Sequence, residues 1–365
     1  MRDVRLDFLR GLAICMILVD HVTSNPLTKF TYQAIGFSDA AEIFVLVSGI
    51  ACGIAYPRAF ARGGHWGLAG SVLKRIARIY AYYVLTTLVV VSIAFLAMKY
   101  LNVELEFYDF EPGDTVGTFV RALAMIQPTP YAGILVLYII LTVAVVPAFV
   151  LARGSPKFLL LAVSALIWGA AQIIDTTHLT PNLFFNPFAW QFLFSIGVMF
   201  GVDRELGSPT LGYLQGLRWV LLLAWSIVLI ALCIRILSIR SIFDVHALRL
   251  DSSVATAMKQ NLAPLRLIHF LSVAYLVSSY FATHSRILKF RLASPLIMMG
   301  ANSLQVFCFS LVLSHALNVL ILVHTPSLAE WLALDVVAFA ALAVAAAAAS
   351  FRRRHRRHVM QLRAK

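Results

Sequence analysis

The stretch "RGLAICMILVDH", residues 10–21, decides the class of this protein. Every residue between Arg10 and Asp20 is apolar or glycine, yet ionisable side chains stand at both ends of the run. About 20 predominantly apolar residues suffice for one membrane-spanning helix. The surrounding residues 6–24 therefore predict a first transmembrane helix, and the run does not end in the small-residue cleavage site of a secretory signal peptide.

The composition extends this interpretation to the whole chain. Of its 365 residues, 61% are hydrophobic and only 13% are charged, whereas soluble domains have about 45–50% and about 25%. Because the apolar runs are continuous and do not alternate, they predict an all-α polytopic membrane protein and argue against a β-barrel. The net charge of +13 comes from short basic clusters between the runs, a pattern typical of cytoplasmic loops and not of nucleic-acid binding.

Ten apolar runs are long enough to span a membrane, with the ninth interrupted by "GANS". They cover about 6–24, 40–57, 77–98, 131–152, 157–175, 188–202, 217–238, 262–282, 295–323 and 327–350. We therefore expect about ten transmembrane helices in one domain, residues 1–350, followed by a basic tail, residues 351–365.

The positions of lysine and arginine orient these helices. Basic loops occur at 58–78, 153–157, 203–218 and 284–291, whereas the loop 99–130 is mostly acidic before residue 121. Since positive loops remain in the cytoplasm, both termini are expected to be cytoplasmic, and the basic tail is expected to contact the lipid bilayer. The loop 239–261 has mixed charge and is the weakest part of this topology.

The four cysteines, Cys15, Cys52, Cys233 and Cys308, each lie within an apolar run. Their positions do not have the spacing of a zinc site or of a redox motif. We expect them to be reduced, buried side chains, and we expect no metal site.

The first run carries its two extreme ionisable residues on one face. Arg10 and His21 are eleven residues apart, which places them about 20° apart around a helix and roughly 16 Å apart along it. An ionisable residue within a span is a hypothesis of function by default. The alternative is that Arg10 reaches the inner headgroups while His21 lies among the outer ones.

Polar residues of the next two runs add to this face. Glu42 is expected level with His21, where a carboxylate would orient the imidazole and raise its basicity. Ser48 and Gly49 lie two turns deeper and suit close approach of a ligand or plain helix packing. Arg75 and Arg78, at the cytoplasmic rim, suit the phosphates of a nucleotide-bearing donor or simple anchoring.

Together these residues resemble the acyltransferase-3 superfamily. The shared pattern is an arginine and a histidine with ten residues between them, an acidic residue before F-x-x-SG, and an arginine cluster before a tyrosine. It stands here as Arg10 with His21, Glu42 with "FVLVSG", and Arg75 and Arg78 before Tyr80. The acidic residue is more often aspartate in that superfamily, and its usual proline near the arginine cluster is absent here.

Longer stretches resemble the OpgC-type branch of that superfamily, from about residue 3 to 315. They include "GFSDAAEIFVLVSGIACGIAYPRAF", "FFNPFAWQFLF", "LAPLRLIHFLSVAYLV" and "NSLQVFCFSLVLS". This resemblance implies a multi-pass enzyme of the bacterial inner membrane that adds succinyl groups to osmoregulated periplasmic glucans. Its co-substrate would be an acyl-CoA, succinyl-CoA above all, with no permanently bound cofactor.

The resemblance also implies roles for individual residues. The donor would enter from the cytoplasm, and the glucan hydroxyl would approach from the periplasm. His21 would be the general base and Glu42 its orienting partner. Arg10 would hold the pantetheine arm or the thioester, and Arg75 and Arg78 the nucleotide phosphates. Asp20, about 100° away on the helix, is the less favoured partner of His21.

More distant residues have open roles. Arg266 could bind the free carboxylate of a succinyl group or pair with a helix carboxylate. Trp190 could stack on a sugar or belong to the interfacial aromatic belt. Asn186 before Pro187 predicts a helix N-cap at the acceptor side. Tyr131, in a turn, could face the acceptor, and Ser303 could line the donor path or tie helices together.

A transporter or flippase for a polar solute is the alternative function, because it also needs buried ions and a polar path. Transporters more often show internal repeats or paired broken helices, and the sequence shows neither. The residues therefore favour an acyl-CoA-dependent O-acyltransferase over this alternative.

Overall fold

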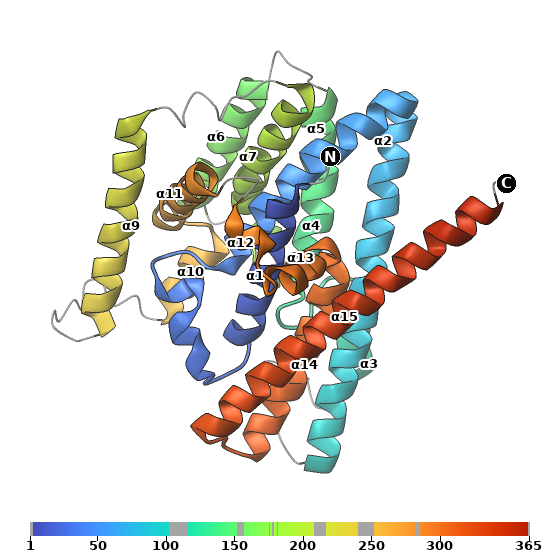
Figure 1. The fold of residues 1–365 in the computed structure, drawn as a ribbon, viewed down its shortest axis with the longest axis vertical. Coiled ribbons are helices and arrows are strands. Elements are labelled where there is room, and N and C mark those ends of the chain that lie inside the picture. The colour runs from blue at the N-terminus through green and yellow to red at the C-terminus, as the bar shows by residue number, and fades with distance from the viewer. Residues whose placement is uncertain are drawn as a thin grey trace.

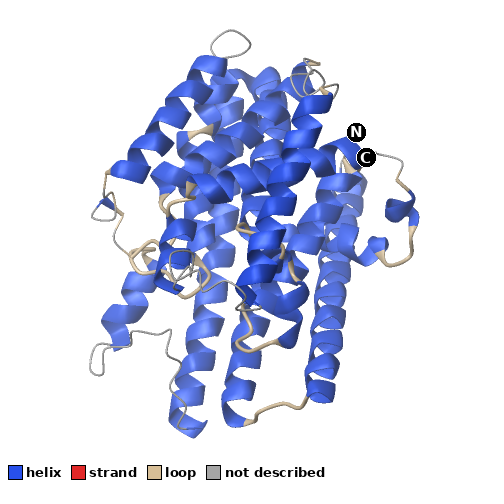
Figure 2. Ribbon diagram, turned by 90° about the vertical axis from the view of Figure 1, so that its left-hand side faces the viewer, coloured by secondary structure: helices blue, strands red, loops and turns tan. Residues whose placement is uncertain are grey.

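The computed structural model describes residues 3–101, 115–151, 157–174, 176, 179–180, 182–207, 217–239, 252–281 and 285–363. Within these ranges the chain is helical and contains no strand (Figure 2), so the predicted all-α class is confirmed. The acidic residues expected in the outer loop, at 104–114, lie outside the described residues.

The helices form one bundle (Figure 1). In chain order they are α1 (Val4–Asp20), η1 (Pro26–Phe30), η2 (Tyr32–Ala34), α2 (Ala40–Leu96), η3 (Ala97–Leu101), α3 (Thr115–Leu123), α4 (Gly133–Ala144), α5 (Val146–Leu151), α6 (Lys157–Ile173), α7 (Pro187–Leu206), α9 (Arg218–Ile239), α10 (Ser252–Gln260), α11 (Pro264–Tyr280), α12 (Arg286–Lys289), α13 (Ala293–Ala301), α14 (Ser303–Val323) and α15 (Leu328–Arg363).

Five helical segments of the described chain are long and apolar enough to cross a membrane. They are Ala40–Leu101, Gly133–Leu151, Arg218–Ile236, Ser303–Val323 and Leu328–His355, and Phe158–Ile173 is a shorter apolar helix. The protein is therefore a membrane protein, and the count of ten spans stays a prediction. Two of the ten expected runs, 40–57 and 77–98, lie in the single helical segment Ala40–Leu101.

The expected loop 58–78 is helical, with one sharp turn inside α2. Gly63 and Gly64 leave the helical conformation there, and Gly64 has φ +57° and ψ −146°. Glycine is the residue that adopts such a conformation without a steric cost. The two arms of α2 consequently run in opposite directions from this turn (Figure 1), which brings the basic residues of the second arm back along the bundle.

Glycine faces bring α2 and α7 into close contact. Gly49 and Gly53 of α2 meet Gly197 and Gly201 of α7, and a Cβ atom added at any of the four would clash with backbone atoms of the other helix. Two such small-residue pairs, spaced four apart, allow helix backbones to approach closely in a membrane. Gly49, for which ligand contact and helix packing were both open, therefore packs against a helix.

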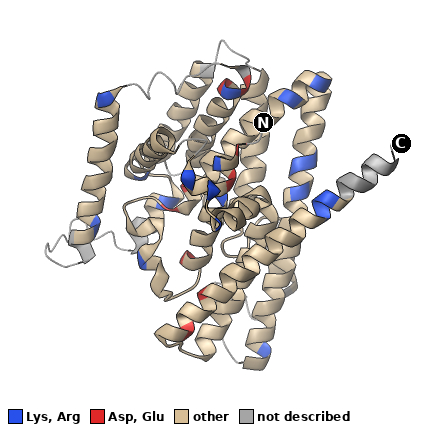
Figure 3. Cartoon of the chain, viewed as in Figure 1, with Lys and Arg blue, Asp and Glu red and all other residues tan. Residues whose placement is uncertain are grey.

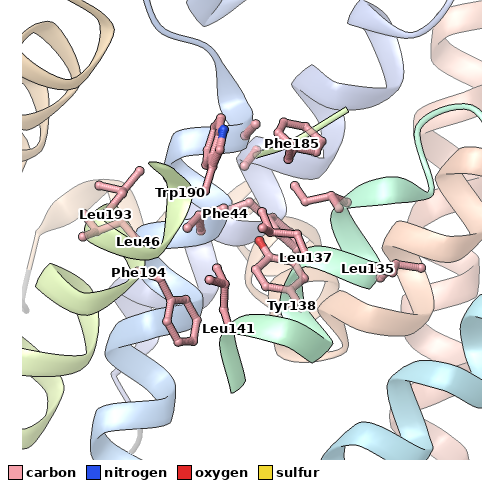
Figure 4. Close-up of a cluster of buried hydrophobic side chains, with 14 of the residues drawn as sticks. Phe44, Leu46, Leu135, Leu137, Tyr138, Leu141, Phe185, Trp190, Leu193 and Phe194 are labelled. Atoms are coloured by element: carbon pink, nitrogen blue, oxygen red, sulfur yellow. The ribbon is translucent and has the colours of Figure 1, made fainter. Parts of the chain in front are cut away.

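The core of the bundle lies where α2, α4 and α7 meet. Phe44, Leu137, Tyr138, Trp190 and Phe194 point into this region (Figure 4) and are at most 5% exposed. The core fixes the outer part of α2, and with it Glu42, against α4 and α7.

The ends of the expected ninth and tenth runs also agree in part with the sequence. The interruption at "GANS" separates α13 from α14, with Asn302 outside helical geometry. α15 continues as a helix through Arg363, so the described part of the basic tail extends the last helix.

Candidate functional site

His21 lies at the carboxyl end of α1, where it is the C-cap residue. Its imidazole stacks on the ring of Tyr131, with 3.8 Å between ring centroids and 18° between ring planes. The His21 Nδ1 atom is buried and has no hydrogen-bond partner in the described part of the chain. A buried polar atom without a partner is uncommon and calls for an explanation, such as a ligand or water.

The structure brings Tyr131 to His21 from a turn just before α4. Tyr131 has φ +63°, a left-handed conformation that is uncommon for a residue with a side chain. The ring of His315, from α14, also contacts the ring of Tyr131, edge to face, with 5.8 Å between centroids and 65° between planes. Tyr131 thus lies beside His21, and the expectation that it faces the acceptor stays a prediction.

Glu42 does not pair with His21 as expected. Its Oε1 accepts a hydrogen bond from Arg266 Nε at 2.8 Å, and its Oε2 accepts one from the backbone N–H of Asp39 at 2.9 Å. The second bond belongs to a capping box, in which Asp39 is the N-cap of α2. Both carboxylate oxygens of Glu42 are thus held by other groups, so this residue does not orient the imidazole directly.

Asp20, the less favoured partner, also points elsewhere. Its Oδ1 accepts hydrogen bonds from Thr31 Oγ1 at 2.7 Å and from Gln33 Nε2 at 2.8 Å. It therefore ties α1 to η1 and η2.

Arg266 and Lys259 form a buried ionic cluster with Asp39 and Glu42. Arg266 lies 3.1 Å from Asp39 Oδ2, and Lys259 Nζ lies 2.8 Å from the same oxygen. Burial opposes ionisation of Asp39, but Lys259 and Arg266 hold its pKa well below the usual range of an aspartate. The cluster contains two acids and two bases, and two of its members, Asp39 and Lys259, also interact electrostatically with His21.

This cluster bears on the two roles left open for Arg266. The guanidinium is already paired with two helix carboxylates, and its side chain is only 10% exposed. A succinyl carboxylate would have to compete with Glu42 and Asp39 for it. The geometry therefore favours the alternative, pairing with helix carboxylates, and binding of the donor by Arg266 stays a prediction.

In the middle of α1, eleven residues before His21, Arg10 lies near Arg75 of α2. Arg10 donates from one guanidinium nitrogen to the backbone oxygen of Val47 at 2.9 Å, and it interacts electrostatically with Arg75. The Nε atoms of both arginines are buried without a hydrogen-bond partner in the described chain, as are the hydroxyls of Tyr56 and Tyr138. Two like charges with spare donors form a site suited to an anion.

The other residues expected to bind the donor, Ser48, Arg78 and Ser303, differ in burial and position. Ser48 is buried beside Tyr138. Arg78 is exposed on the second arm of α2, away from the buried position of the Arg75 Nε atom. Ser303 begins α14. Its neighbour Asn302 donates hydrogen bonds to Met298 and Ser350 and so ties α13 to α15, whereas the role of Ser303 stays a prediction.

A family model described as OpgC protein matches residues 2–354. The chain belongs to the OpgC family. No curated protein and no solved structure matches it. Membership in the OpgC family implies an enzyme of the acyltransferase type. The geometry above places an imidazole at the carboxyl end of α1 and, eleven residues earlier on the same helix, Arg10 beside Arg75 of α2.

Two acceptor-side expectations change in this OpgC-family protein. Trp190 is fully buried, and its Nε1 donates to the backbone oxygens of Lys259 and Gln260. It is therefore neither a stacking platform at the surface nor part of an interfacial belt. Asn186 is the N-cap of α7, as predicted, and its amide nitrogen donates to Thr176 and Asn261, so its side chain is used within the protein.

The structure adds residues that sequence reasoning missed. Asn318 of α14 donates to the backbone oxygen of His21 and accepts from the backbone N–H of Thr23, both at 2.9 Å. Asn318 and His315 stand in an apolar run, and polar residues at membrane depth were the only signal that could have identified them. The described residues contain no group of three or more His, Cys, Asp or Glu side chains that could hold a metal ion.

Proposed function

We propose that this OpgC-family protein is an integral membrane O-acyltransferase of the bacterial inner membrane. It moves a succinyl group from cytoplasmic acyl-CoA to hydroxyls of periplasmic glucans, with His21 as the general base. The proposal includes its expected kinship with the wider acyltransferase-3 superfamily. Family membership supports the glucan succinyltransferase role.

One observation carries the mechanism. α1 has a half-buried imidazole at one end and, eleven residues earlier, a guanidinium. The Nδ1 of the first and the Nε of the second have no hydrogen-bond partner among the residues that the structure describes. The first group can take a proton, and the second can hold an anionic or polar part of a donor. Along a helix these two positions are roughly 16 Å apart, a separation that the extended pantetheine arm of coenzyme A can bridge.

The transfer step follows from general acid–base chemistry. The glucan hydroxyl oxygen bonds to the thioester carbonyl carbon while its proton passes to the His21 imidazole. The carbon–sulfur bond then breaks, and coenzyme A leaves as a thiolate that recovers the proton from the imidazolium. Tyr131, stacked on His21, would lie next to the acceptor.

The donor would be held by the arginine pair. Arg10 and Arg75, with the hydroxyl of Tyr56, supply buried donors for which the described part of the chain offers no hydrogen-bond partner. A phosphate or the thioester carbonyl would accept hydrogen bonds from these donors and would reduce the repulsion between the two positive charges by lying between them. In this arrangement Ser48 lines the same region, and Glu42 acts on His21 only through the ionic cluster.

A transfer assay tests this function. The detergent-purified protein is incubated with succinyl-CoA carrying a radiolabelled succinyl group and with a linear glucan, and label in the glucan is counted. We expect transfer by the wild type and a loss of about a hundredfold or more in His21→Asn, because a positioned base contributes about 10² to 10⁴ in rate.

The control is His65→Asn, which changes an exposed histidine near the turn of α2 and should leave transfer unchanged. Full activity in a folded His21→Asn variant would contradict the assignment of the base. Uptake of free glucan into sealed vesicles without any donor, together with an absence of label transfer, would instead support a transporter or flippase.

A further inference from the structure

We propose that Tyr131 and His315 are positioning residues that orient the His21 ring, in place of the carboxylate that commonly holds a catalytic imidazole. The proposal rests on the proposed role of His21 as the base. It gives α14, through His315 and Asn318, the task of fixing both the backbone and the ring of His21.

First, hydrogen bonds at Nδ1 do not orient the imidazole of His21 in the described part of the chain. The Nδ1 atom of His21 has no partner in the described chain, and both oxygens of Glu42 bind other groups. A histidine ring without an orienting hydrogen bond can rotate about its side-chain torsions unless packing restrains it. The ring of Tyr131 supplies that restraint, because it lies nearly parallel to the imidazole at 3.8 Å.

The second step is the position of Tyr131 itself. It sits in a left-handed conformation, with φ +63°, which persists only where the surroundings determine it. The edge contact with His315, at 5.8 Å and 65°, is one such determinant. Aromatic pairs prefer this geometry over looser arrangements.

The third step is the fixed orientation of His315. Its Nδ1 lies 2.7 Å from the backbone oxygen of Leu311. A carbonyl oxygen only accepts hydrogen bonds, so His315 Nδ1 carries the proton and the ring plane is set by α14. His315 is 5% exposed, and packing therefore also restricts its rotation.

Asn318 completes the arrangement from the same helix face. Three residues after His315, it holds the backbone oxygen of His21 and the backbone N–H of Thr23, and residues three apart on a helix are neighbours. One turn of α14 thus holds the main chain of His21 directly and its ring through Tyr131. A base restrained in this way is held near the geometry that proton transfer requires.

Variants at Tyr131 separate stacking from the presence of a hydroxyl. Tyr131→Phe keeps the ring, whereas Tyr131→Leu keeps an apolar side chain without a ring. We expect Tyr131→Leu to lower kcat at least about tenfold further than Tyr131→Phe does, since small misplacements of a catalytic group have large effects on rate. KM for succinyl-CoA should change little in both, because Arg10, beside which Arg75 lies, is eleven residues from His21 along α1.

His315 provides an independent variant. His315→Ala removes the ring that supports Tyr131 and should lower kcat in the same direction as Tyr131→Leu. His315→Phe keeps an aromatic ring and should recover part of the loss. A merely structural role would lower the folded fraction in all variants without this dependence on a ring, so the melting temperature of each variant is measured in parallel.

A second readout does not depend on transfer activity. Diethyl pyrocarbonate modifies accessible imidazoles, and the rate at His21 is followed by mass spectrometry of its peptide. We expect several-fold faster modification in Tyr131→Leu and His315→Ala than in the wild type or Tyr131→Phe. If these two variants are modified faster but the wild-type protein itself transfers no label, the positioning role stands and the proposed function fails.

The opposite result would overturn the inference. If His21→Asn is inactive while Tyr131→Leu and His315→Ala keep wild-type kcat and wild-type modification rates, the proposed function stands and the positioning role fails. A uniform loss of activity in Tyr131→Phe and Tyr131→Leu alike would also overturn it, because the hydroxyl and not the stacked ring would then be required.

Discussion

At the scale of single residues, Arg266 links two segments that are more than 200 positions apart in the chain. Its guanidinium binds Glu42 and Asp39 at the start of α2. Removing one partner of a buried ion pair leaves an uncompensated charge and typically costs about 3–5 kcal/mol. We expect Arg266→Ala to lower the melting temperature clearly and to reduce transfer from succinyl-CoA and acetyl-CoA by the same factor.

Thermal unfolding in detergent and the two donor assays check this expectation, with exposed Arg286→Ala as the control. A selective loss of succinyl transfer with an unchanged melting temperature would show that Arg266 binds the donor carboxylate after all.

Arg75 leads to a second prediction, about the donor. Its Nε is buried beside Arg10 and has no hydrogen-bond partner within the described ranges, so a bound anion gains a charge-assisted hydrogen bond there. We expect Arg75→Gln to weaken the binding of coenzyme A at least about tenfold, the loss typical of one such bond of about 1.5–3 kcal/mol. Lys74→Gln, an exposed neighbour, should bind normally. Isothermal titration with coenzyme A measures both, and equal affinities would contradict the anion site.

At the residue scale, the sequence indicates types better than partners. The placement of Arg10 and His21 on one face of a helix could be predicted from their spacing. The N-cap at Asn186 could be predicted because Asn186 directly precedes Pro187. The partner of Glu42 could not be predicted, because its ligand Arg266 is brought to it by tertiary packing. The burial of Trp190 depends on the same packing and on the backbone oxygens of Lys259 and Gln260.

At the scale of elements, glycines on both helices let the backbones of α2 and α7 approach closely. Gly201→Val would place two methyl groups against the backbone of Gly53 and Ile50. We expect this variant to unfold at a clearly lower temperature, because overpacking costs typically 1–3 kcal/mol and often more against backbone. Gly169→Val, on α6 where a Cβ meets open space, is the matched control.

Comparable melting temperatures for these two variants would show that the helices can separate without cost. The turn at Gly63 and Gly64 illustrates what element-level prediction misses. The basic composition of 58–78 correctly marks a change of direction, but it does not reveal that the chain stays helical on both sides of it.

At the scale of the whole molecule, the distribution of charged residues predicts the orientation in the membrane. Both chain ends lie in the upper half of Figure 1, and lysine and arginine gather on α2 and α15 toward that end, whereas acidic side chains of α15 lie near the opposite end (Figure 3). By the positive-inside rule this predicts that the basic end is cytoplasmic. The segment between α14 and α15 should then face the periplasm.

Cysteine labelling in intact cells checks this orientation. Ser327→Cys, between α14 and α15, should react with a membrane-impermeant maleimide added outside, and Ser285→Cys, at the start of α12, should react only after lysis. Reversed labelling would invert the topology, and with it the sides from which donor and acceptor arrive.

The overall class of this molecule follows from its composition, since continuous apolar runs leave few alternatives to a helical membrane bundle. The number of spans does not, because a run such as 295–323 can break at Asn302 and two runs can share one helical segment.

The central claim is that an acyl group loaded at the cytoplasmic end meets a hydroxyl from the other side at His21. Sealed proteoliposomes with the basic end inward, radiolabelled succinyl-CoA enclosed and glucan outside, test it most directly. We predict that label appears on the external glucan with the wild type and not with His21→Asn. Label that appears equally with both proteins, or only when donor and glucan share one side, would contradict the claim.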